Sequence, residues 1–231
     1  MKKFLKANWK NLIMINFEVS KDLLISYLPK GTEIDMWNNK AYVSLVAFLF
    51  DKTKIAGFPA VGNQKFEELN IRFYVKKVEG KKEKRGVAFI REIVPKPLVT
   101  GLANLCFSEH YKTLKMGHKT IYFDSTKKEI KNIEYTVEKN GVHRVSARLT
   151  PELIDLSEGS FEEFIAEHYW GYSRVNDRKT IEYEVQHPKW QIYNGAKVSY
   201  QCDFKSLYGN KWGFLNTQVP VSMFVAKGSE V

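Results

Sequence analysis

The sequence has few cysteines and none of the short motifs that mark the common enzyme classes. Its two cysteines, Cys106 and Cys202, stand far apart in 231 residues. Their spacing predicts neither a disulfide framework nor a zinc site, and we expect both thiols to be buried. There is no GxSxG elbow, no GxGxxG and no Walker loop, which argues against the usual hydrolase, dinucleotide and nucleotide sites. The five histidines show no HExxH or paired spacing, so we expect no metal and no cofactor.

Long apolar runs are also missing. No stretch approaches the roughly 20 apolar residues that cross a bilayer. The start of the chain resembles a signal peptide, but Lys6, Asn8 and Lys10 interrupt its apolar region, so export is not expected. We therefore predict a cytoplasmic protein with no membrane partner.

Positive charge is in excess. The chain has 36 Lys and Arg against 26 Asp and Glu, a formal net charge of +10. Such a balance can attract nucleic acid, anionic lipid or a small anion. The densest basic run, residues 76–85, reads as a hairpin tip, and no run resembles the aromatic and basic core of an RNA-recognition fold. Binding of nucleic acid or another polyanion is therefore the alternative function, and not the favoured one.

Hydrophobic periodicity predicts many strands and three short helices. Strands are expected at 41–50, 67–75, 86–94, 130–137, 142–149, 180–186, 192–204 and 221–225, and helices at 21–28, 97–107 and 161–170. Asn140 and Gly141 supply the two positive-φ positions of a tight hairpin turn. No linker or repeat divides the chain, so we expect one domain over 1–231. Its class is mainly β (α+β), a closed antiparallel β-barrel with a few peripheral helices, because closure removes exposed edges.

Several aromatic positions are expected to form core. In the third helix, one stripe has the spacing of a buried face; its members are Phe161, Phe164, Ile165, His168 and Tyr169. Trp190 follows a His-Pro pair and is likewise interpreted as closing the core rather than contacting a ligand.

The stretch "EELNIRFYV" alternates strictly and gives the first candidate site. Its apolar face holds Leu69, Ile71, Phe73 and Val75, and its polar face holds Glu68, Asn70, Arg72 and Tyr74. Periodicity alone leaves open whether the polar face meets water or lines a cavity.

A second polar cluster follows the second helix, with His110, Tyr111, Lys112 and Lys115. With the polar face it would make a site: Arg72 offers a planar fork for a carboxylate, and Glu68 can act as an acid or base. Tyr111 could anchor or protonate a ligand. A solvated outer strand beside a polar loop is the alternative interpretation.

Five blocks of the sequence, in order, resemble the YqjF-like family. They are "DLLISYLPKGTEIDMWNNKAYVSLVAFLF", "FEELNIRFYV", "SEHYKTLKM", "SFEEFIAEHYWGY" and "QHPKW". The resemblance covers roughly residues 8 to 200. That family is grouped with the acetoacetate decarboxylase-like fold, so the resemblance implies a cone-shaped β-barrel with peripheral helices.

The resemblance also bears on the chemistry. In acetoacetate decarboxylase a barrel lysine forms a Schiff base with a β-keto acid, and a neighbouring lysine lowers its pKa. The matching segment here is 109–113, in which Tyr111 stands at the Schiff-base position and Lys112 at its neighbour, although one residue of slip would reverse this. A tyrosine cannot form an imine, so the decarboxylase mechanism is not expected unless Lys112 points inward.

The favoured function is binding of a small anionic organic molecule inside the barrel. The resemblance favours an inward polar face, so the cavity would be lined by Glu68, Asn70, Arg72, Tyr74 and Tyr111. Arg72 and Lys112 would orient the anion, His110 would contact it, and Glu68 would accept a proton if there is turnover. Any enzyme activity would be that of a decarboxylase-like lyase or another acid/base enzyme on a small carboxylate. A homo-oligomer is left open.

Overall fold

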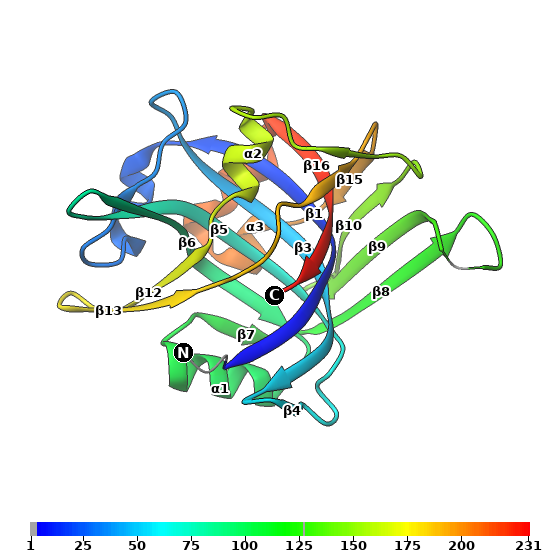
Figure 1. Cartoon of the computed structure of the whole chain (residues 1–231), viewed down its shortest axis with the longest axis horizontal. Coiled ribbons are helices and arrows are strands. Elements are labelled where there is room, and N and C mark those ends of the chain that lie inside the picture. Colours follow the sequence, from blue (N-terminus) through cyan, green and yellow to red (C-terminus); the bar gives the residue numbers. More distant parts are fainter. Residues whose placement is uncertain (1–3, 127) are drawn as a thin grey trace.

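A computed structural model describes residues 4–126 and 128–231 of the chain. Their strands form two sheets (Figure 1). The larger sheet contains β1 (Leu5–Val19), β2 (Glu33–Ile34), β3 (Ala41–Ile55), β4 (Phe58–Pro59), β5 (Phe66–Glu79), β6 (Lys82–Val94), β7 (Tyr111–Thr113), β11 (Leu153–Asp155), β12 (Trp170–Asn176), β13 (Lys179–Glu184), β14 (Gln191–Tyr193) and β16 (Ser222–Glu230). The smaller sheet contains β8 (Lys115–Tyr122), β9 (Ile130–Glu138), β10 (Val142–Arg148) and β15 (Lys197–Gln201).

Few helices accompany the sheets. They are α1 (Pro97–Phe107), α2 (Phe161–Ala166), α3 (Phe204–Tyr208) and the short 3₁₀ helices η1 (Lys21–Leu23), η2 (Ile25–Tyr27) and η3 (Asn210–Asn216). In Figure 1 the long strands β1, β3 and β5 curve through the middle of the molecule, with α1 at one end and α2 at the other. A mainly β protein with a few helices is thus confirmed.

The expected closed barrel is not confirmed. The main path of the larger sheet runs β11-β14-β16-β1-β3-β5-β6-β12-β13. Among the described residues, no pairing joins its end strands β11 and β13, so this sheet remains open. The sheet is also not wholly antiparallel, because β12 on the main path and β7 beside it both pair with β6 in parallel.

Local signals placed several elements correctly. The turn of the β9–β10 hairpin has Asn140 at φ 50° and Gly141 at φ 122°, as the dipeptide predicted. Ser160 caps α2, because its Oγ accepts a hydrogen bond from the Glu163 amide at 3.1 Å. The Glu163 carboxylate accepts in return from the amide of Gly159 at 2.7 Å. The α2 helix then ends at Ala166, four residues before the predicted end.

Other predictions were wrong in extent. The helix expected at 21–28 is two 3₁₀ turns, and the strand expected at 192–204 is split into β14 and β15. Strand β1 was not predicted, because its polar residues near the N-terminus hid the alternation. Cys106 is exposed rather than buried.

Both faces of the larger sheet are covered. On one face Ile71 and Phe73 of β5 join a core with Tyr135 and Val145 of the smaller sheet and Trp212 of η3. On the other face lies a second core, made by residues such as Phe48, Tyr74, Phe164, Ile165 and Trp190. A strand with both faces covered normally reads as a continuous apolar run. The alternating polar side chains of β5 are therefore enclosed, and they need partners there.

Candidate functional site

Three of the four residues on the polar face of β5 line a cavity of about 500 Å³. Glu68 is 2% exposed, Asn70 3% and Arg72 7%, and all three belong to the cavity lining. The sequence left open whether this face meets water, and the structure places it inward. Three polar side chains so well buried are unusual for a structural strand, which makes this cavity the candidate site.

A β-bulge completes the polar end of the cavity. From the hairpin tip to Arg72, paired positions of β5 and β6 follow one register, with Arg72 opposite Phe89. The register then shifts by one residue, so that Asn70 faces Glu92. Glu92 in turn pairs with Tyr111 of β7. Because residues opposite each other share a face of the sheet, the bulge brings Glu92 and Tyr111 beside the β5 residues.

Glu68 is held by two hydrogen bonds. Its Oε1 accepts from the Asn70 amide at 2.7 Å and its Oε2 accepts from the Tyr111 hydroxyl at 3.0 Å. Burial raises the pKa of Glu68 to about 7, and these hydrogen bonds limit the rise. A carboxyl group with this pKa can both donate and accept a proton near neutral pH.

Two more carboxyl groups complete an acid cluster of Glu68, Glu92 and Glu109. Burial, with the charges of Glu109 and Glu68, raises the pKa of Glu92 well above its usual range. Burial likewise raises the pKa of Glu109, although hydrogen bonds from Ser173 and Tyr183 oppose the rise. Like charges in one enclosed space cannot all ionise, so the acid cluster retains protons.

Arg72 is the cationic group of the cavity lining. Its Nη2 donates to the Ile165 carbonyl at 3.2 Å, while its Nε has no hydrogen-bond partner. Among the described residues, no carboxylate oxygen lies within 4.0 Å of an Arg72 side-chain nitrogen. Its guanidinium lies 5.7 Å from the ring centroid of Tyr74. A buried guanidinium that lacks a carboxylate partner is costly unless it serves a ligand.

His168 also lines the cavity, although the sequence assigned it to the core. Its side chain is 1% exposed. Its Nε2 donates to Asp35 at 3.1 Å, and Asp35 also accepts from Arg85 at 2.7 Å. Burial lowers the pKa of His168 to about 4, so the ring is neutral at pH 7. With the proton fixed on Nε2, Nδ1 is an acceptor, and it has no partner.

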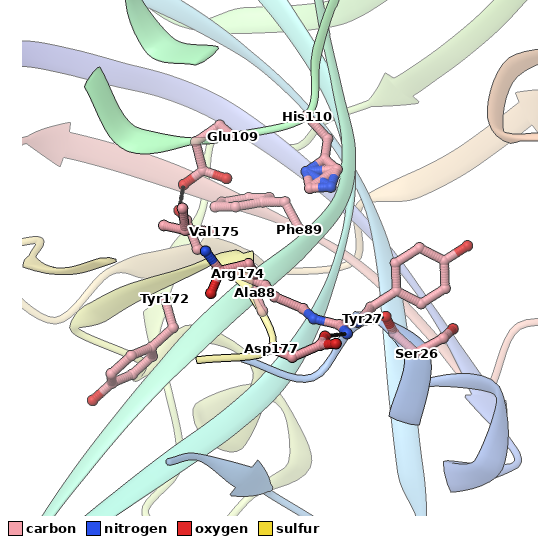
Figure 2. Close-up of a pocket in the computed structure, with 12 residues that line it drawn as sticks. Ser26, Tyr27, Ala88, Phe89, Glu109, His110, Tyr172, Arg174, Val175 and Asp177 are labelled. Atoms are coloured by element: carbon pink, nitrogen blue, oxygen red, sulfur yellow. Dashed lines mark hydrogen bonds and ion pairs between the residues drawn. The ribbon is translucent and has the colours of Figure 1, made fainter. Parts of the chain in front are cut away.

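The structure separates three predicted site residues from this group. Tyr74 belongs to the second core, and its hydroxyl hydrogen-bonds Ser44 at 2.5 Å rather than facing the cavity. His110 is exposed and lines a second hollow of about 390 Å³. Figure 2 shows Glu109, Phe89 and His110 gathered at one end of this hollow. Glu109 and Phe89 line both spaces and therefore form the wall between them.

Lys112 lies on the other side of β7 from Tyr111. Successive residues of a strand point to opposite faces, and Lys112 does not line the cavity. Together with Arg91, it contributes to lowering the pKa of Lys139, after the larger effect of burial. Lys115 forms an ion pair with Glu138 at 2.9 Å. Among the described residues that line the cavity, none is a lysine.

An aromatic wall forms much of the remaining lining. It consists of Trp9, Phe48, Phe50, Phe66 and Trp190. Trp190 is 3% exposed, as expected of a core residue, yet it also faces the cavity. Its ring stacks on the His187 ring at 4.1 Å between centroids, and its Nε1 donates to Ser229 at 2.9 Å. Trp190 is therefore both a core residue and part of the cavity lining.

The basic run at 76–85 is largely strand rather than loop. Lys77 and Lys84 both pair with Glu79 and Glu182, at 2.7 to 2.8 Å. Much of its charge is therefore neutralised within the protein.

Metal-ligating clusters and membrane-spanning helices are both absent from the described residues. Over residues 4–126 and 128–231, no group of three or more His, Cys, Asp or Glu is arranged to hold a metal ion. Over the same residues, no helix is long and apolar enough to cross a membrane.

The fold is similar to that of acetoacetate decarboxylase-like enzymes. An acetoacetate decarboxylase-like enzyme from Sphingomonas wittichii RW1 matches with a TM-score of 0.61 and 9% identity, over 100% of this chain and 94% of that one. The enduracididine biosynthesis enzyme MppR, solved with pyruvate, gives 0.60 and 10%, over 100% and 87%. Acetoacetate decarboxylase from Legionella pneumophila gives 0.60 and 11%, over 99% and 87%. At these identities the likeness shows the fold alone.

The family follows from the sequence itself. The model of DUF2071, described as an uncharacterized conserved protein, matches residues 6–230, and the chain belongs to this family. It is 23% identical over 202 residues to the uncharacterized protein YqjF of Bacillus subtilis (strain 168), over 84% of this chain and 78% of that protein.

Proposed function

We propose that the protein binds an organic carboxylate in the cavity and acts on it by proton transfer, without a Schiff base. The observation that carries the proposal is Arg72, a buried guanidinium on the lining with no carboxylate partner within 4.0 Å among the described residues. A ligand carboxylate would pair with it in a forked geometry and offset the cost of burying the charge.

The acid cluster supports an anionic rather than a cationic ligand. Three ionised carboxylates would repel an anion, but the raised pKa values of Glu68, Glu92 and Glu109 keep much of that charge neutral near pH 7. A guanidinium group is positively charged at physiological pH. The polar end of the cavity can therefore accept a negative charge, and its protonated carboxyl groups can donate hydrogen bonds to it.

Glu68 is the group we assign to proton transfer. Its pKa of about 7 suits a general acid or base at neutral pH. Tyr111, whose pKa burial raises well above 10, stays protonated and holds Glu68 in place. The absence of lysine from the described lining speaks against an imine intermediate. The solved complex of MppR with pyruvate supports a carboxylate ligand for a protein of this fold.

Calorimetric titration of small carboxylates into Arg72→Gln tests the proposal. Losing a buried charged hydrogen bond should weaken binding by roughly tenfold to a hundredfold. Arg91→Gln is the matched control. Arg91 lies on β6, on the opposite face of the sheet, and it also donates to a backbone carbonyl, that of Leu207 at 2.7 Å. Equal affinity in the wild type and the Arg72 variant would refute the role of Arg72.

A further inference from the structure

The cavity is much larger than a short keto acid. Its volume is about 500 Å³. One water molecule occupies roughly 30 Å³ in the liquid, so a ligand of about six non-hydrogen atoms such as pyruvate would fill only a fraction of this space. A ligand that binds specifically must therefore carry a larger body than such an acid.

The aromatic wall defines the chemistry of that body. Phe50 and Phe66 stack with 4.6 Å between ring centroids, and Trp9 packs against Phe48 at 5.3 Å and Trp190 at 6.2 Å. Phe48, Phe50, Phe66 and Trp190 are each at least 94% buried, so their positions are fixed by packing. Flat aromatic faces prefer to contact other rings or compact apolar groups. The wall therefore suits an aromatic or branched apolar body.

Hydrogen-bond inventory defines the head group. Among the described residues, ten buried side-chain polar atoms have no hydrogen-bond partner, and six of them belong to residues that line the cavity. Asn70 Oδ1 and His168 Nδ1 can only accept, because Glu68 engages the Asn70 amide nitrogen and Asp35 engages the other His168 nitrogen. Arg72 Nε and Trp9 Nε1 are free donors, and Thr53 Oγ1 and Glu92 Oε2 can either donate or accept. A complementary head group supplies an anion to Arg72 and a donor to Asn70 or His168.

We infer that the ligand is a hydroxylated carboxylic acid with an aromatic or branched apolar body. The inference rests on the proposed function, because Arg72 must bind the carboxylate. The hydroxyl group donates to Asn70 or His168, and the body lies against the aromatic wall. An unsubstituted fatty acid would leave the acceptors unpaired, and a short hydroxy acid would leave the wall uncovered.

Four probes separate the parts of this inference by calorimetric titration at constant salt. They are 2-hydroxy-3-phenylpropanoate, its deoxy form 3-phenylpropanoate, its primary amide, and lactate, which lacks the phenyl ring. We expect the first to bind tightest. Removing the ring should weaken binding by about tenfold to a hundredfold, and removing the hydroxyl by about fivefold.

Each of the other possible outcomes refutes one specific part of the inferred ligand structure. Equal affinity for lactate would refute the apolar body, and equal affinity for the deoxy form would refute the hydroxyl donor, while both leave carboxylate binding intact. If the amide binds as well as the acid, or if no carboxylate binds, the proposed function itself fails.

A variant of His168 tests the acceptor directly. His168→Phe, which removes the acceptor, should reduce the preference for the hydroxylated over the deoxy probe, which a folding defect would not do. Asn70→Leu and the double variant are tested in parallel, since either acceptor can receive the hydroxyl. His143→Phe is the control, because His143 is 6% exposed and bonded to Lys139 and Asp203, away from the cavity lining. Unchanged preference in the double variant would overturn the acceptor assignment.

Discussion

At the scale of single residues, adjacent glutamates on β5 have opposite electrostatic environments. Glu68 faces the cavity, where burial raises its pKa to about 7. Glu67 points to the other face and hydrogen-bonds His118 at 2.5 Å. Although burial raises the pKa of Glu67, that hydrogen bond and nearby charges lower it overall. Because successive side chains of a strand point to opposite faces, the Glu67 carboxylate is stabilised in its charged form, whereas Glu68 keeps its proton up to about neutral pH.

This contrast gives a pH-dependent prediction for Glu68→Gln. As pH rises above 4.5 the unfolded chain releases the Glu68 proton, while the folded chain keeps it until about pH 7. Folding is therefore penalised progressively between about pH 5 and 8, by up to about 3 kcal/mol. The glutamine variant lacks this penalty, so its stability relative to wild type should improve over that range in denaturant unfolding.

Glu67→Gln is the matched comparison for that measurement. A carboxylate whose pKa is lowered in the folded state stabilises the protein above about pH 4.5 and loses this effect only at lower pH. The Glu67 variant should therefore be destabilised at both pH 5 and pH 8. A relative stability of the Glu68 variant that does not change with pH would contradict a raised Glu68 pKa.

The sequence predicted some of these residues and not others, for physical reasons. Glu68, Asn70 and Arg72 were predicted to share one face because period-two alternation places them there. His168 was not predicted to line the cavity, because its spacing from Phe164 fits a buried stripe, and burial does not distinguish a core residue from one that lines a cavity. Glu109 was missed because its enclosure depends on Ser173 and Tyr183, far along the chain.

At the scale of elements, β6 and β12 approach closely at a glycine. The pair is parallel, with Gly86 opposite Trp170. A β-carbon on Gly86 would lie 2.5 Å from the Trp170 carbonyl oxygen and 2.6 Å from the Tyr172 ring. Since the Trp170 carbonyl oxygen is a backbone atom, strands β6 and β12 would have to move apart.

Gly86→Ala should therefore lower the free energy of unfolding by about 1 to 3 kcal/mol, the range for overpacking. Gly101→Ala is the control. A β-carbon there meets nothing within 4 Å, and the position lies inside α1. Alanine should raise stability at Gly101 by up to about 1 kcal/mol through helix propensity. Thermal or denaturant unfolding measures the stability of both variants. Equal changes in the free energy of unfolding would contradict the close approach of β6 and β12.

Element prediction failed where tertiary contacts override local pattern. Strand β1 is interrupted by a bulge between Lys10 and Ile13, with Asn11 at φ 54°. This irregularity and the flanking lysines break the alternation that identifies strands. The hairpin at Asn140 and Gly141 was predicted because its turn chemistry is local.

At the scale of the whole molecule, the larger sheet separates Lys112 from the cavity. Tyr111 and Lys112 lie side by side in β7 yet face opposite sides of it. Closure into a barrel was predicted from strand number, but strand number does not determine which edges meet. Enclosure of the cavity instead comes from the curved sheet together with α1 and the segment around Trp190.

This separation predicts that borohydride will not trap a keto acid in the cavity. After incubation with acetoacetate and borohydride, intact-mass analysis and peptide mapping should find no adduct at Lys112 above that of exposed lysines. Tyr111→Lys is the positive control, because it places an amine in the cavity and should gain an adduct. Selective labelling of Lys112 in the wild type would show that it reaches the ligand.

The bulge in β6 makes the charge of the cavity depend on strand register as well as on residue type. If the same residues were paired without the bulge, the register from the hairpin tip would set Arg91 opposite Asn70 and turn Glu92 away. A homologue that kept every residue here but lacked the bulge would therefore carry a guanidinium where this protein carries a carboxyl group, whereas one that lost both Ile90 and the bulge would keep the carboxyl group. Transferring a site assignment between homologues therefore requires knowing where the bulge lies as well as matching the residues themselves.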